Sequence, residues 1–163
     1  MERTRYTWIE SPVGALLLAG DETALTTLAF SSGKHPIAPA PDWIEDARPF
    51  TAVQRQLDEY FASERREFDL PLRLEGTPFQ REVWQELCRI PYGETISYGE
   101  LARRIGRPNA PRAVGLANGS NPIAIVVPCH RVIGSSGALT GFGGGLETKA
   151  RLLSLERGQL AVL

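Results

Sequence analysis

The hydrophobic pattern of the chain changes near Glu75-Gly76, and this change limits the possible folds more than any other feature of the sequence. Before it, three strand-like stretches at 6–10, 15–19 and 24–30 are separated by turn residues, which predicts a small antiparallel meander. Residues 49–62 then place apolar side chains at helical spacing. After Glu75-Gly76, helical spacing predominates. We therefore predict an α+β fold in which a small N-terminal β-sheet-plus-helix domain precedes a mostly helical C-terminal domain.

The predicted boundary between these domains coincides with a clear helix start. Thr77 is a good N-cap and Pro78 suits the first helical position, so a helix should begin there. Cys88 falls on the apolar stripe of this helix and is expected in the core. The two domains are expected to span residues 1–75 and 76–163, and the first shows no visible chemistry, so we interpret it as a scaffold.

Residues 97–118 have the pattern of a helix-turn-helix. Ser97 followed by Glu100 is a capping-box pattern at the start of one short helix. The turn at 106–109 contains glycine, and a second helix is expected over residues 110–118. Four arginines with no acid among them fall within ten residues, namely Arg103, Arg104, Arg107 and Arg112. Short helix pairs are also common in ordinary cores, so the pattern alone does not establish a DNA-binding surface.

The distribution of charge favours a polyanionic partner for the second half of the chain. The net charge is −1, which by itself argues against a nucleic acid. Residues 1–75 contain 13 acidic and 8 basic residues, whereas residues 76–163 contain 6 acidic and 10 basic ones. An excess of positive charge in one half is typical of proteins that bind polyanions. Chance segregation of surface charge is the alternative.

The composition predicts a cytoplasmic protein with no membrane partner. No stretch approaches the roughly 20 apolar residues that a membrane helix needs, and no apolar signal-peptide core follows the first residues. The two cysteines and two histidines do not form a zinc-ligand pattern. We therefore expect two free thiols and no metal site.

The most distinctive chemistry lies in Pro128-Cys129-His130-Arg131, after an apolar run at 123–127 that predicts a buried strand. A cysteine attacks as a thiolate, so it needs a base or a positive field. His130 is the nearest base, but neighbours on a strand point to opposite faces, so their contact requires a turn or a bridging water. Glu147 or Glu156 could orient the imidazole. The alternative is a core cysteine beside a surface histidine.

Six strings are distributed over residues 91–146 in the second half of the chain. They are Pro-Tyr-Gly-Glu-Thr at 91–95, Ser-Tyr at 97–98, Arg-Ala-Val-Gly at 112–115, Ala-Asn-Gly-Ser-Asn-Pro at 117–122, Pro-Cys-His-Arg-Val-Ile-Gly at 128–134 and Gly-Gly-Leu at 144–146. This set resembles the O6-alkylguanine-DNA alkyltransferase family, also called methylated-DNA–protein-cysteine methyltransferases. The first half is similar to the smaller domain of that family, though less distinctively.

The resemblance implies DNA repair by irreversible transfer of the alkyl group from O6-alkylguanine onto Cys129, so that each molecule acts once. It implies that His130 is the base, acting through a water, and that Glu156 orients this histidine. Asn121 matches the asparagine that bonds within the hinge before the reactive segment. The resemblance implies no cofactor and no metal.

The resemblance also implies how damaged DNA is held. The partner would be double-stranded DNA, read through the minor groove by a monomer, with the damaged base rotated out of the stack. Tyr98 matches the tyrosine at the phosphate and the base, and Arg112 matches the arginine that fills the vacated space. Further substrate contacts are implied for Gly99, Ser135, Phe142 and Gly143. Many members have tyrosine at position 142 and some have serine at position 143, so hydroxyl contacts there are absent and a backbone N–H is left to meet the O6 atom.

The loop at 134–145 contains six glycines. Glycine has no Cβ, so such a wall would leave room beside Cys129 for alkyl groups larger than methyl. We therefore expect ethyl and benzyl adducts to be accepted.

Three other functions are compatible with parts of the sequence. One is a relative that binds the same lesion but lacks the acceptor cysteine, and the presence of Cys129 disfavours it. A second is a Cys-His hydrolase, which would turn over and would need no helix-turn-helix. A third is a transcriptional regulator built on residues 97–119.

Overall fold

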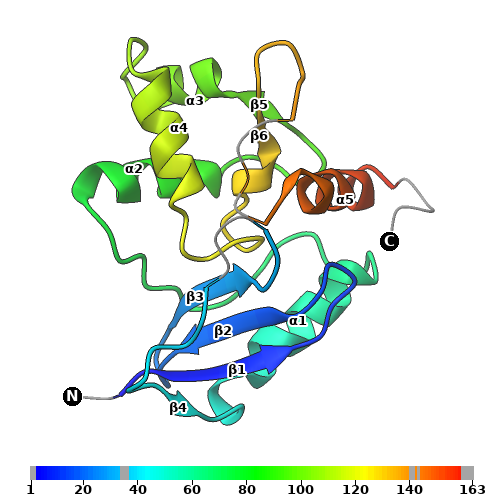
Figure 1. Cartoon of the computed structure of the whole chain (residues 1–163). Helices are drawn as coiled ribbons and strands as arrows, with labels where there is room; N and C mark the ends of the chain where they lie inside the picture. Colours follow the sequence, from blue (N-terminus) through cyan, green and yellow to red (C-terminus); the bar gives the residue numbers. More distant parts are fainter. Residues whose placement is uncertain (1–2, 34–36, 140–141, 143, 159–163) are drawn as a thin grey trace.

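The computed structural model describes residues 3–33, 37–139, 142 and 144–158, and its mixed architecture confirms the predicted α+β fold (Figure 1). The N-terminal part contains β1 (Arg5–Ile9), β2 (Leu16–Gly20), β3 (Leu25–Phe30), β4 (Ile44–Glu45), the 3-10 turn η1 (Arg48–Phe50) and the helix α1 (Thr51–Phe61). The C-terminal part contains α2 (Pro78–Leu87), β5 (Ile96–Ser97), α3 (Tyr98–Arg104), α4 (Pro111–Gly119), the 3-10 turn η2 (Cys129–Arg131), β6 (Val132–Ile133) and α5 (Leu146–Glu156).

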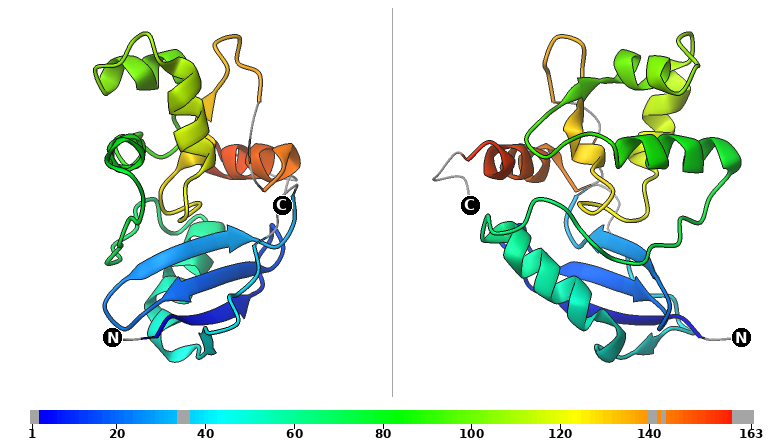
Figure 2. Two further views of the ribbon diagram at one scale, coloured as in Figure 1. Left: turned by 60° about the vertical axis from the view of Figure 1, so that its left-hand side comes forward. Right: turned by 180° about the vertical axis from the view of Figure 1, so that it is seen from behind.

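The N-terminal sheet has the strand order β3-β2-β1-β4. The first three strands are antiparallel neighbours, which confirms the predicted meander, and β4 joins β1 in parallel. The helix α1 lies against one face of the sheet (Figure 2). Apolar side chains of this helix, among them Val53 and Leu57, are buried because they recur at helical spacing on that side.

The outer edge of β3 is occupied by two segments from further along the chain. Near its start, the N–H of Leu25 donates to the carbonyl of Pro71 (2.9 Å). Further along, the N–H of Leu28 donates to the carbonyl of Pro122 (2.9 Å), and the carbonyl of Leu28 accepts from the N–H of Ala124 (3.0 Å). The second segment leads directly to Cys129, so β3 helps to position that residue.

The predicted buried strand at 123–127 is wrong, because the run forms turns after a single bridge to β3 at Ile123. The N–H of Val127 donates back to the carbonyl of Ile123 (3.0 Å), and Ile125 adopts a positive φ of 70°. The side chain of Asn121 holds the turn, donating to the carbonyl of Val127 (2.7 Å) and accepting from the N–H of Ile123 (3.0 Å). An uninterrupted apolar run has no period that separates a buried strand from a buried turn.

The predicted helix starts in the C-terminal part are confirmed. The Thr77 hydroxyl accepts from the N–H of Gln80 (3.1 Å), and the Gln80 side chain accepts from the N–H of Thr77 (2.9 Å). Ser97 caps α3 by accepting from the N–H of Glu100 (3.0 Å), and α3 packs on α4 as a helix-turn-helix pair. The expectation of a buried Cys88 is wrong: α2 ends at Leu87, and Cys88 is exposed at its C-cap.

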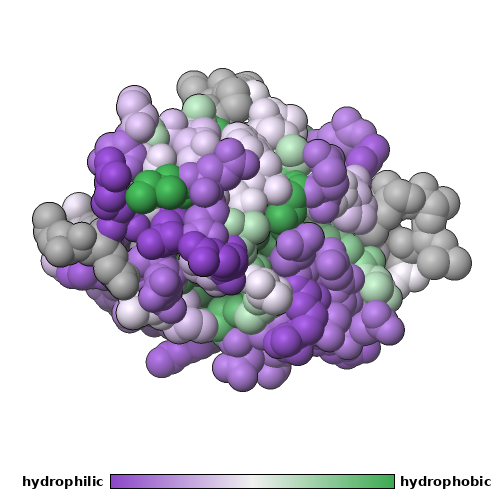
Figure 3. Space-filling model, turned by 90° about the horizontal axis from the view of Figure 1, so that it is seen from below, coloured by the Kyte–Doolittle hydropathy of each residue, from purple (hydrophilic) through white to green (hydrophobic). Residues whose placement is uncertain are grey.

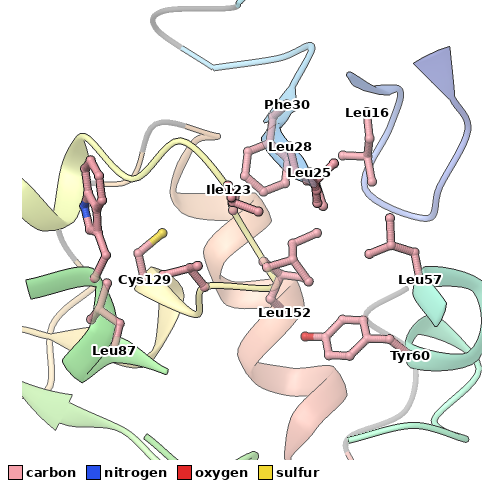
Figure 4. Close-up of a cluster of buried hydrophobic side chains, with 14 of the residues drawn as sticks. Leu16, Leu25, Leu28, Phe30, Leu57, Tyr60, Leu87, Ile123, Cys129 and Leu152 are labelled. Carbon is pink, nitrogen blue, oxygen red and sulfur yellow. The ribbon is translucent and has the colours of Figure 1, made fainter. Parts of the chain in front are cut away.

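One buried cluster runs through both parts of the molecule (Figure 4). Members labelled there include Leu16, Leu28, Leu57, Tyr60, Leu87, Ile123, Cys129 and Leu152. Seen from below, the surface is mostly polar, with small apolar patches between the charged side chains (Figure 3). Within the described ranges, no helix is long and apolar enough to cross a membrane.

Candidate active site

Cys129 begins the 3-10 turn η2, and only 6% of its surface is exposed. Its N–H donates to the carbonyl of Val127 (2.8 Å), and its carbonyl accepts from the amide of Asn118 (3.4 Å). Because this segment is a turn, the side chains of Cys129 and His130 are not forced to opposite faces as they would be on an extended strand. The turn that a direct or water-mediated interaction between these two side chains requires is therefore present.

His130 is fully buried and is held by Glu156. Its Nε2 atom lies 2.6 Å from Oε2 of Glu156. Its Nδ1 atom has no hydrogen-bond partner among the described residues. The other candidate acid, Glu147, has a side chain that is 79% exposed and pairs with Arg151 at 2.9 Å. Of the two acids that the sequence left open, the structure brings Glu156 to the histidine.

The carboxylate of Glu156 is surrounded by donors. Besides His130, it accepts from Arg131 at 2.8 and 3.0 Å, from the hydroxyl of Tyr60 at 2.7 Å and from the N–H of Gly93 at 3.3 Å. Burial alone would raise the pKa of Glu156, but the hydrogen bonds and charges of His130 and Arg131 outweigh it and lower that pKa. Glu156 is therefore an anion at neutral pH.

The two reactive groups are neutral before any chemistry begins. Burial raises the pKa of the Cys129 thiol, against the opposing effects of the Asn121 side chain and the charge of Lys149. Burial lowers the pKa of His130, against the opposing effect of Glu156. A neutral imidazole that donates from Nε2 to a carboxylate leaves Nδ1 as an acceptor. The arrangement supplies a thiol and, on the same turn, a base able to take up a proton.

Lys149 of α5 is a buried cation that the sequence analysis did not single out. Its Nζ donates to the carbonyl of Val132 (2.6 Å) and lies 6.0 Å from the centre of the Tyr98 ring. Burial lowers the pKa of Lys149, and a negative charge on Cys129, present once the thiolate forms, opposes this shift. One signal was available, because Lys149, Leu152 and Glu156 are spaced to share one face of a helix.

A cavity of about 350 Å³ opens beside Cys129. Its lining comes mainly from β3, from residues 118–122 at the end of α4 and just after it, and from the last part of the glycine-rich loop. Phe142 takes part, with its ring centre 5.4 Å from that of Phe30. Asn118 lines it as well, and its Oδ1 atom is buried without a hydrogen-bond partner in the described part of the chain.

The remaining predicted site residues lie around this centre or on the surface. Tyr98 and Gly99 are the first two residues of α3. The ring of Tyr98 lies near the ammonium group of Lys149. Arg112 is exposed near the start of α4, and Ser135 is exposed in the turn after β6. Neither lines the cavity. Gly143 falls outside the described residues.

Arg112 differs from the other arginines of this region. Arg103 and Arg104 pair with Glu100 at 2.8 and 3.3 Å, and Arg107 lies 3.8 Å from Glu82. For Arg112, within the described residues, no acidic side chain forms an ion pair with its guanidinium.

Comparison with known sequences matches nearly the whole chain to one family. The sequence model of the 6-O-methylguanine DNA methyltransferase DNA-binding domain matches residues 78–158, and that of the ribonuclease-like domain matches residues 4–74. The methylated-DNA–protein-cysteine methyltransferase of Methanosarcina barkeri is 55% identical over 155 residues, covering 95% of this chain and 98% of the relative. The protein of the same name from Mycolicibacterium paratuberculosis is 56% identical over 152 residues, covering 93% and 92%.

Solved structures give the same result. The crystal structure of Mycobacterium tuberculosis OGT in complex with DNA matches with a TM-score of 0.88 and 52% identity, covering 96% of this chain and 94% of that one. The crystal structure of Mycobacterium tuberculosis O6-methylguanine methyltransferase matches with a TM-score of 0.89. An O6-methylguanine DNA methyltransferase from Methanococcus jannaschii shares the fold at 23% identity, with a TM-score of 0.68.

Proposed function

Since this chain belongs to the 6-O-methylguanine DNA methyltransferase family, we propose that it repairs DNA by moving the alkyl group of O6-alkylguanine onto the sulfur of its own Cys129. The observation that carries the assignment is the hydrogen bonding of the two ring nitrogens of His130. Its Nε2 is engaged by Glu156 at 2.6 Å, and its buried Nδ1 has no partner among the described residues. This histidine can therefore act as the base for the neighbouring thiol.

The reaction begins with a proton transfer. His130 accepts the thiol proton of Cys129 at Nδ1 through a bridging water, and Glu156 stabilises the imidazolium that forms. Without this base the thiol would stay protonated at neutral pH, because burial raises its pKa. The charge of Lys149 also favours the thiolate.

The thiolate then displaces guanine in one substitution step. A carbon–sulfur bond forms as the bond between the alkyl carbon and O6 breaks, and the electron pair of that bond leaves with the guanine. The proton held by His130 offsets the negative charge that the guanine acquires. The product is a thioether, which water does not hydrolyse, so each molecule is used once. The steps use groups of the protein, the damaged base and the bridging water.

Two further residues have proposed roles at this centre. Asn121 fixes the turn that delivers Cys129 through its bonds to Ile123 and Val127. Tyr98 lies at the start of α3 and beside Lys149, and its proposed role is to contact the departing guanine and to stabilise its charge.

The DNA partner is bound through α3 and α4. A side chain as buried as Cys129 cannot reach a base inside a duplex, so the damaged nucleotide must rotate out of the stack into the cavity. The exposed cation of Arg112 then fills the space that this base leaves, entering from the minor groove. Gly99, Ser135, Phe142 and Gly143 are proposed to line the path of the base. All of these residues come from one chain, so we propose a monomer.

Intact mass spectrometry after incubation with an O6-methylguanine duplex tests the proposal. The protein should gain one methyl group, peptide mapping should place it on Cys129, and Cys129→Ser should gain none while it still binds DNA. With substrate in excess, repair should stop at one lesion per molecule. Sustained turnover, or a methyl group on another residue, would show the proposal to be wrong.

A further inference from the structure

We propose that Tyr60, a residue of the N-terminal part, is a positioning residue of the reaction centre that sets the basicity of His130 through Glu156. The inference rests on the proposed role of His130 as the base. It gives the N-terminal part, which shows no chemistry of its own in the sequence, a direct connection to the alkyl transfer.

The contact that carries the inference is a buried hydrogen bond across 96 residues of sequence. The hydroxyl of Tyr60 donates to Oε2 of Glu156 at 2.7 Å, and this is the same oxygen that holds Nε2 of His130 at 2.6 Å. Tyr60 has no exposed surface, and Figure 4 shows its hydroxyl directed away from α1 toward the centre of the cluster. Tyr60 and His130 therefore share one carboxylate oxygen.

The ring of Tyr60 is fixed, so the hydroxyl has little freedom to leave. Its ring centre lies 5.2 Å from that of Phe61, 5.4 Å from that of Phe68 and 6.2 Å from that of Tyr92. Burial, followed by the negative charge of Glu156, holds the pKa of Tyr60 well above its ordinary value. The hydroxyl is thus always protonated, and toward the carboxylate it can act only as a donor.

The shared oxygen gives a defined direction of effect. Each donor to Glu156 withdraws negative charge from the carboxylate and weakens its stabilisation of imidazolium. Losing the Tyr60 hydroxyl should make Glu156 a stronger acceptor and raise the pKa of His130. A protonated His130 cannot take the proton of Cys129, so transfer would then fail at a higher pH than in the wild-type protein.

Other titratable and charged groups also surround Glu156 and His130. They come from the segment after α1 (Arg66), from the end of α2 and the segment that follows (Cys88 and Tyr92), from η2 (Cys129 and Arg131) and from α5 (Lys149). Tyr92 is the informative member. It also lies near Glu156 and Arg131, but its hydroxyl makes no hydrogen bond to Glu156 within the described residues. Tyr92→Phe is therefore a matched control for Tyr60→Phe.

The test is a direct titration of His130 by NMR in the full chain. The sequence contains two histidines, so [13Cε1]histidine labelling in a His35→Gln background leaves His130 as the one signal. Tyr60→Phe should raise the pKa of His130 by about one unit, the size expected for losing one strong donor to a buried carboxylate. Tyr92→Phe should leave it unchanged. The acid limb of the single-turnover transfer rate should move by the same amount as the titration.

Three outcomes decide the matter. Identical His130 titrations in wild type, Tyr60→Phe and Tyr92→Phe would overturn the proposal, even if Tyr60→Phe unfolds more readily, because Tyr60 would then be a packing residue. If Tyr60→Phe fails to fold, 3-fluorotyrosine at position 60 keeps the bond and strengthens the donor. It should lower the pKa of His130, and no change would overturn the proposal. A shifted titration without alkylation of Cys129 would uphold the link to Glu156 and refute the proposed function.

Discussion

Phe30 of β3 packs against Phe142 across the cavity beside Cys129, with ring centres 5.4 Å apart and planes at 56°. The sequence predicted a wall of glycine backbone here. In the structure, a Cβ placed on Gly144 would lie 2.5 Å from the ring of Phe30. An aromatic ring from the N-terminal sheet therefore occupies the space beside Gly144, and a large residue at Gly144 would displace that sheet as well as narrow the cavity.

The first prediction concerns the alkyl group. Phe30→Leu should enlarge the cavity and raise the rate of benzyl transfer relative to methyl transfer, because a bulky group has most to gain from the removed ring. Single-turnover rates on O6-benzylguanine and O6-methylguanine in the same duplex measure this ratio. Phe50→Leu, which changes a buried phenylalanine at the start of α1, is the control. An unchanged ratio in Phe30→Leu would mean that Phe30 does not limit the cavity.

The second prediction concerns pH. Burial lowers the pKa of His130 and Glu156 opposes this, so Glu156→Gln should lower that pKa further. The acid limb of the transfer rate should then move to lower pH, opposite to the shift expected for Tyr60→Phe. A weaker base should also slow transfer on the plateau, by about 100-fold. Glu147→Gln, on the exposed side of the same helix, should change neither property. An acid limb that stays in place in Glu156→Gln would exclude Glu156 as the partner of the base.

The third prediction concerns Arg112. If its exposed cation enters the stack, Arg112→Ala should slow repair of duplex DNA far more than reaction with free O6-benzylguanine, which needs no base rotation. Arg107→Ala removes a nearby arginine that already lies 3.8 Å from Glu82 and should have a smaller effect. Equal losses on both substrates would contradict the role. A simple phosphate contact would instead reduce the salt dependence of binding by about one counterion.

The fourth prediction concerns the turn before the reactive cysteine. Asn121→Ala removes two hydrogen bonds that close the segment from Ile123 to Val127. The free energy of unfolding should fall by about 2 kcal/mol, at roughly 1 kcal/mol for each bond. Ser120→Ala removes one bond on the surface and is the control. Urea denaturation of the three proteins gives the values, and a loss in Asn121→Ala no larger than in Ser120→Ala would contradict this account.

Local patterns predicted much of the fold. The meander follows from turn residues between short apolar runs, and the starts of α2 and α3 follow from Thr77 and Ser97, whose side chains cap the first turns. These features depend on neighbours within four residues. The turn at 123–127 could not be predicted in the same way, because what bends it is its pairing with β3 and the bonds of Asn121.

In the reaction centre, residues that are neighbours in the sequence could be predicted, whereas contacts between distant residues could not. Cys129 and His130 are adjacent, and Glu156 needed the resemblance to the family to be chosen over Glu147. The role of Tyr60 could not be read from the sequence. Helical spacing places that residue on the buried side of α1, but spacing says nothing about which distant group its hydroxyl meets.

The outer edge of β3 has a consequence for solubility. An open edge strand offers unpaired N–H and C=O groups to strands of other molecules and promotes aggregation. Here the backbone of Leu25 is engaged by residues 71–73, and that of Leu28 by residues 122–124. The second cover is the segment that leads to the reactive cysteine. Local opening of that segment would therefore expose Cys129 and, at the same time, the unpaired backbone groups of β3. Loss of the reaction centre and self-association are thereby coupled.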